Sequence, residues 1–215
     1  MSDLLWACCI FILAHIIPSY QPLRERCVSI LNERVFMSIY GLISLGLFIW
    51  LVRTYLNAPY IELWTMEIWM SHTTLSIMFI VCILLVCSFS QPNPFSLGIG
   101  GKGYDPKNPG IVSLCKHPAL IAFALWSFSH ILPNGDMASV LFFGLMGALS
   151  LYGPFSLNQK RRRQLGLENW QRLSKETVSG WPHIGWQRWL SAGLLYIGLL
   201  YAHEPVIGIA PVVFP

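Results

Sequence analysis

The sequence predicts an all-α integral membrane protein, a bundle of about six transmembrane helices that forms a single domain over residues 1–215. Composition is the first reason, because 54% of the residues are apolar and only 11% are charged. Soluble domains carry about 25% charged residues. The second reason is a mean hydropathy of +0.55, which points to a membrane protein. The third reason is that six apolar segments approach the ~20 residues that a helix needs to cross a bilayer.

These six segments account for most of the chain. They run roughly over 3–19, 36–57, 68–89, 118–133, 137–157 and 189–209. The first and the fourth are short, and each is closed by a proline, Pro18 or Pro133. Between the fourth and the fifth, Asn134-Gly135-Asp136 predicts a tight turn, with Asp136 as the cap of the fifth helix.

Basic residues are distributed very unevenly among the connections. Thirteen of the fourteen Lys and Arg residues follow the first, third and fifth segments, whereas 58–67 and 134–136 contain none. Loops rich in Lys and Arg remain on the cytoplasmic side of a membrane. The sequence therefore predicts that both termini lie on the opposite, outer side.

The longest basic connection, 158–188, combines seven Lys and Arg residues with scattered Trp and Leu. We expect an interfacial helix that lies on anionic headgroups. Since this charge already faces a membrane, no nucleic-acid partner is expected. The loop 91–110 contains GIGGKG. No strand precedes it, and prolines follow where a helix should begin, so a turn-rich connection is the better interpretation.

Histidines inside the apolar segments are the candidate functional residues, because ionisable groups at membrane depth usually mark a site. A rise of about 1.5 Å per residue places them by depth. The outer group comprises His72, His130, His203 and Arg53, and the inner pair comprises His15 and His117. Imidazole is a usual axial ligand of haem, and an arginine could pair with a propionate. The alternative is that these histidines hydrogen-bond across helices or face headgroups.

Several short motifs resemble those of a known family. They are AHIIPS at 14–19, NER at 32–34, NAPYIELW at 57–64, WMSH at 69–72, KHP at 116–118 and SHILPNGD at 129–136. Together they resemble the NnrU family of bacterial membrane proteins, named for an association with nitric-oxide respiration and denitrification. The family is related to 15-cis-zeta-carotene isomerase, a haem-b membrane enzyme. The resemblance implies a multi-pass protein of the bacterial inner membrane, with periplasmic termini given the charge pattern.

The same resemblance implies His15 and His130 as ligands of a haem b. The depth assignment places them in opposite halves of the membrane. Either the first span is tilted or shifted, or the partner of His130 is His72 or His203. Two functions follow as hypotheses, a redox-linked isomerisation of an apolar polyene and an accessory role in nitrogen-oxide respiration. A cofactor-free scaffold in the lipid bilayer is a further alternative.

A more distant likeness concerns the cytoplasmic side. KHP together with LGLENWQRLSKETVSGWP at 165–182 resembles membrane methyltransferases of the isoprenylcysteine carboxyl-methyltransferase kind. In those enzymes, the corresponding segments build a pocket for S-adenosylmethionine. The acidic residues that precede the glycine there are missing here, since 158–166 contains no acid. Methyl transfer is therefore the alternative function.

Overall fold

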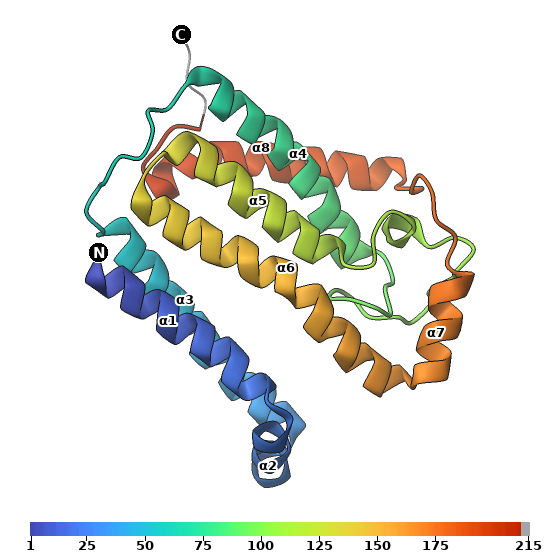
Figure 1. Cartoon of the computed structure of the whole chain (residues 1–215). Coiled ribbons are helices and arrows are strands. Elements are labelled where there is room, and N and C mark those ends of the chain that lie inside the picture. Colours follow the sequence, from blue (N-terminus) through green and yellow to red (C-terminus); the bar gives the residue numbers. More distant parts are fainter. Residues whose placement is uncertain (212–215) are drawn as a thin grey trace. The chain divides into compact units, whose positions relative to one another are not determined.

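A computed structural model describes residues 1–211, and within them the chain is all-helical, without a strand (Figure 1). Its α-helices are α1 (Ser2–Ile16), α2 (Gln21–Leu31), α3 (Glu33–Leu56), α4 (Ile68–Ser90), α5 (Pro118–Asn134), α6 (Met137–Leu165), α7 (Leu167–Glu176) and α8 (Trp186–Ile207). Two 3₁₀ turns, η1 (Ile17–Ser19) and η2 (Gly110–Ser113), complete the secondary structure.

Four of these helices, α3, α4, α6 and α8, are long and apolar enough to cross a membrane. The pair α1 and α2, bent by 74°, could add a fifth crossing as one broken span. The predicted all-helical, multi-pass membrane protein is thus confirmed. The count of six is not reached by length and composition, because α1 has 15 residues and α5 has 17.

The chain forms two compact units. The first comprises Met1–Thr65 and Gly135–Leu145, and the second comprises Met66–Asn134 and the chain from Met146 onwards. Helix α6 therefore begins in the first unit and continues into the second. The single domain over 1–215 stays a prediction.

In the first unit, α1 packs against α3, and the loop after α3 meets the turn before α6. The carbonyl of Gly135 accepts hydrogen bonds from the backbone N–H groups of Leu63 (2.8 Å) and Trp64 (3.1 Å). Asp136 Oδ1 accepts one from the Ser139 N–H at 3.1 Å. The predicted cap at the start of α6 is thereby confirmed.

In the second unit, α4 packs against both α5 and α8. One polar link joins two of these helices, since Thr74 Oγ1 donates to the Ser129 carbonyl at 2.7 Å. Many large apolar side chains of α8 remain exposed, for example Leu194 at 62% and Ile197 at 50%. An apolar helix that exposes such side chains suits contact with lipid.

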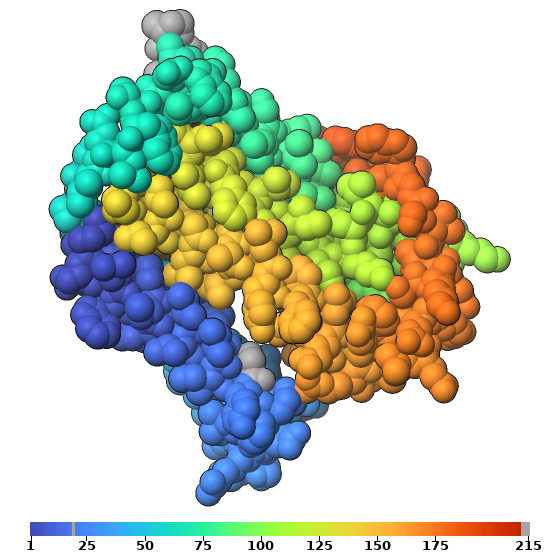
Figure 2. All heavy atoms as spheres, in the orientation of Figure 1, coloured from blue at the N-terminus to red at the C-terminus, as the bar shows by residue number. Residues whose placement is uncertain are grey.

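The polar end of the second unit is built from connections. The basic segment 158–188 is not the single interfacial helix that was expected, because it is divided into the last turns of α6, the short helix α7 and a non-helical stretch up to Gly185. Gly166, at φ +78°, allows the break between α6 and α7. The loop between α4 and α5 is irregular apart from η2, as predicted. In Figure 2, the orange atoms of α7 adjoin the green atoms of this loop.

Candidate functional site

The best-defined polar arrangement surrounds His117, which directly precedes Pro118, the first residue of α5. Its side chain is buried, with 6% exposed. The Nε2–H donates to Asn158 Oδ1 at 3.0 Å, and the Ser96 hydroxyl donates to Nδ1 at 3.1 Å. Burial lowers the pKa of His117; the Asn158 bond opposes this effect and the charge of Lys116 adds to it. His117 is therefore a neutral, fully bonded side chain that ties three segments together.

Arg161 extends this arrangement, because it lies three residues after Asn158 on the same face of α6. Its Nη2 donates to the Ser96 carbonyl at 2.6 Å, and its Nη1 donates to Gln164 Oε1 at 3.0 Å. Its Nε is buried and has no hydrogen-bond partner among the described residues. We call Ser96, His117, Asn158 and Arg161 the His117 cluster.

A second cluster lies beside it and consists of Lys116, Arg162 and Trp170. Lys116 Nζ lies 5.0 Å from the centre of the Trp170 ring, and the Arg162 guanidinium carbon lies 4.2 Å from it. Lys116 Nζ also donates to Ser174 Oγ and lies 5.4 Å from the Phe95 ring centre. Burial, and then the charge of Arg162, lowers the pKa of Lys116. We call Lys116, Arg162 and Trp170 the cation–indole cluster.

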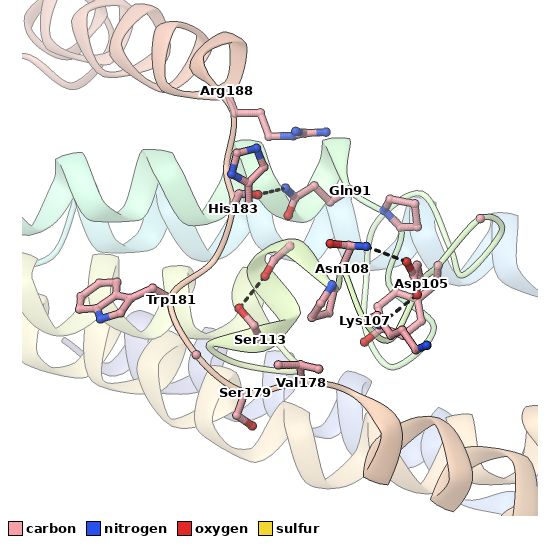
Figure 3. A pocket seen from close by; sticks show the side chains of 16 residues that line it. Gln91, Asp105, Lys107, Asn108, Ser113, Val178, Ser179, Trp181, His183 and Arg188 are labelled. Atoms are coloured by element: carbon pink, nitrogen blue, oxygen red, sulfur yellow. Dashed lines mark hydrogen bonds between the residues drawn. The ribbon is translucent and has the colours of Figure 1, made fainter.

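An open pocket of about 520 Å³ lies between residues of 91–113 and 178–188 (Figure 3). Much of its polar lining is already bonded within the protein. Gln91 Oε1 accepts from the Ile111 N–H at 2.7 Å, and Arg188 Nη1 donates to the Ile184 carbonyl at 2.9 Å. Hydrogen bonds from Asn108 Nδ2 and the Lys107 N–H lower the pKa of Asp105. These bonds hold the shape of the loop around the pocket.

The histidines expected to bind haem are divided between the two units. The second unit contains His72, His130 and His203, and the first contains His15 together with Arg53. His130 lies on α5 and His203 on α8 of this unit, whereas His72 is exposed on α4. Within residues 1–211, no group of three or more His, Cys, Asp or Glu side chains could hold a metal ion. Haem ligation by two histidines, and the propionate role of Arg53, stay predictions.

Three of these histidines share one local geometry. Nδ1 lies 2.8 Å from the Phe11 carbonyl oxygen in His15, 2.7 Å from that of Trp126 in His130, and 2.7 Å from that of Ile209 in His203. A carbonyl oxygen can only accept, so Nδ1 carries the proton and, in the neutral ring, Nε2 carries the lone pair. This is the orientation typical of imidazoles that coordinate metals.

Comparison with protein families supports the motif resemblance. The family model described as NnrU protein matches residues 3–211. The chain belongs to the NnrU family. No curated protein and no solved structure matches it.

The sequence does not predict the hydrogen-bond partners of His117 in this NnrU-family chain. Ser96 and Asn158 lie 21 and 41 residues from His117 in the sequence, in segments interpreted as connections. The signal that could have found Asn158 is the continuation of the fifth helix beyond residue 157, with Arg161 one turn later. No sequence pattern marks the packing of Lys116 against Trp170.

Proposed function

We propose that this NnrU-family chain is a six-span protein of the bacterial inner membrane, with both termini in the periplasm, and that it binds one b-type haem through His130. The six-span topology rests on the four long helices together with α1 and α5, which coincide with the two short predicted spans. It also places every strongly basic connection on the cytoplasmic side.

The observation that carries the haem proposal is the hydrogen bond of His130. Its Nδ1–H donates to the Trp126 carbonyl at 2.7 Å, so in the neutral ring Nε2 is the nitrogen that carries the lone pair and would bind an iron. The Trp126 and His130 ring centres are 5.5 Å apart, which restricts rotation of the imidazole. The donor chemistry of His130 thus fits an axial ligand of haem.

The second histidine that would hold the haem is proposed to be His203. It belongs to the same unit as His130, and its own Nδ1–H is bound to a carbonyl. His15, the partner implied by the family resemblance, has the same Nδ1 geometry. Substitution of each histidine in turn distinguishes the two pairings.

A bound b-type haem supplies an iron that changes oxidation state, which suits redox-linked isomerisation of an apolar polyene or an accessory role in nitrogen-oxide respiration. The protein contributes orientation of the imidazole through the Trp126 carbonyl. The protein also contributes the largely apolar helix α5, on which His130 lies.

The test is the absorption spectrum of the full-length protein, purified in mild detergent and measured oxidised and reduced. We expect a Soret band that His130→Ala abolishes or shifts. His203→Ala should change the spectrum and His15→Ala should not; the reverse result would assign His15 as the partner. His183→Ala is the matched control, since His183 is exposed and lies in a loop. A colourless protein, or an unchanged spectrum in His130→Ala, would refute the proposal.

The pocket in Figure 3 supports a second candidate, S-adenosylmethionine-dependent methyl transfer. Its volume of about 520 Å³ falls in the range of small-molecule sites, about 300–1,000 Å³. Its walls come partly from the segment that resembles the methyltransferases. Calorimetric titration with S-adenosylmethionine decides this candidate, because absence of saturable binding would eliminate it.

A further inference from the structure

We propose that the cation–indole cluster, together with Arg161, binds a phosphate-bearing anion. The site would take either the phosphodiester of an anionic lipid headgroup or a soluble phosphate. This inference does not depend on the haem proposal, because it concerns different residues at the polar end of the second unit.

Uncompensated positive charge is the first feature of this region that favours an anion. Lys116, Arg161 and Arg162 converge on one region, since Lys116 and Arg162 share the Trp170 ring and Arg161 reaches the segment next to Phe95. No carboxylate pairs with any of the three among the residues that the structure describes. Two cations over one indole attract the ring but repel each other. An anion close to both would offset that repulsion.

Two buried N–H groups are the second feature that favours an anion. Trp170 Nε1 and Arg161 Nε are both buried, and neither has a hydrogen-bond partner in the described part of the chain. Trp170 is 9% exposed. Buried N–H groups are nearly always bonded in proteins, so such exceptions point to a missing acceptor. An indole N–H and a guanidinium N–H can only donate, so the missing partner is an acceptor, and an anionic oxygen is the strongest kind.

The donors of this region also indicate which type of anion it would bind. Guanidinium and ammonium groups from three side chains offer several donors in different directions, which matches the several oxygens of a phosphate better than a single carboxylate. Ser174 adds a hydroxyl beside Lys116. Arg162 is exposed and Lys116 is half-buried, so an anion can reach these two members of the cluster from outside the protein. Basic clusters next to membrane spans typically meet anionic headgroups, which makes a lipid one natural source.

Two binding experiments on delipidated full-length protein separate the sources. Native mass spectrometry with phosphatidylglycerol tests a lipid, with phosphatidylcholine as the zwitterionic control. Calorimetry with inorganic phosphate tests a soluble ligand. We expect Arg162→Gln to weaken whichever ligand binds by roughly tenfold to hundredfold, the effect of losing one charge-assisted contact. Lys116→Gln should act similarly.

Arg163→Gln is the matched control. It removes the same charge from the next residue of α6, which is also exposed and belongs to neither cluster. Binding that weakens in Arg162→Gln but not in Arg163→Gln supports the site. Equal weakening in both variants would indicate diffuse attraction and overturn it, and so would the absence of binding by both ligands. Because Arg162 is exposed, its substitution should leave the fold intact, which circular dichroism verifies.

Discussion

Replacement of Asn158 by leucine tests whether the His117 cluster holds the polar end of the second unit together. The two side chains have similar size, so the change removes the amide oxygen and leaves little cavity. His117 Nε2–H, now bonded to Asn158 Oδ1 at 3.0 Å, would lose its acceptor. Because His117 is only 6% exposed, water cannot readily replace that oxygen.

The expected loss of stability follows from the burial of the His117 N–H group that has lost its acceptor. A buried N–H without a partner destabilises a protein by about 1–3 kcal/mol. For a chain of this size, each kcal/mol lowers the unfolding temperature by about 2–4 °C, so Asn158→Leu should lower it by about 2–12 °C.

The assay is loss of the folded peak in size-exclusion chromatography after heating in detergent. All variants must be heated at one rate, because unfolding of membrane proteins is commonly irreversible. Gln159→Leu is the matched control, since it makes the same amide-to-leucine change at the next, exposed residue of α6. It should change stability by no more than about 0.5 kcal/mol. Equal apparent unfolding temperatures for the two variants would refute the inferred role of Asn158.

Two further predictions concern pH and backbone strain. Since the folded-state pKa of His117 is lowered, the unfolded ring binds a proton first, and stability should fall as pH decreases from about 6.5 towards the folded-state pKa. Asn158→Asp should reduce this acid sensitivity in the same heating assay, because a carboxylate stabilises the imidazolium; an unchanged pH dependence would contradict the assignment. Gly135→Ala should destabilise by more than 1 kcal/mol, because Gly135 has φ +62° and a Cβ there would lie 2.2 Å from the Trp64 carbonyl oxygen. Gly103→Ala is the control, because Gly103 has φ +79° and nothing lies within 4 Å of an added Cβ, so this change should reduce stability less. Equal losses of stability would show that the contact with Trp64 is unimportant.

Features that depend on residues close together in the sequence were predictable from it. A span is recognised by about 20 consecutive residues, and each of the six apolar segments contains a helix, four of which are long and apolar enough to cross a membrane. The cap at Asp136 uses an N–H three residues away, and it was predicted correctly. The family was also predictable, because its motifs are short and occur at several places between residues 14 and 136.

The candidate site shows the limit of such reasoning. His130 was identified from its membrane depth, but the Nδ1–H bond to Trp126 required the actual rotamer. The grouping of His72 with His130 was expected from depth alone. Depth does not determine which way a side chain points around its helix, and His72 proves to be exposed.

The sequence by itself determined that this protein is helical, apolar and crosses a membrane several times, because transfer of each segment into lipid depends on that segment's own composition. Only the tertiary structure decided that Ser96 and Asn158 bond His117 and that Lys116 and Arg162 share the ring of Trp170. Those contacts join residues far apart in the chain. They depend on how α6 and α7 pack against the loop before α5, which no local pattern specifies.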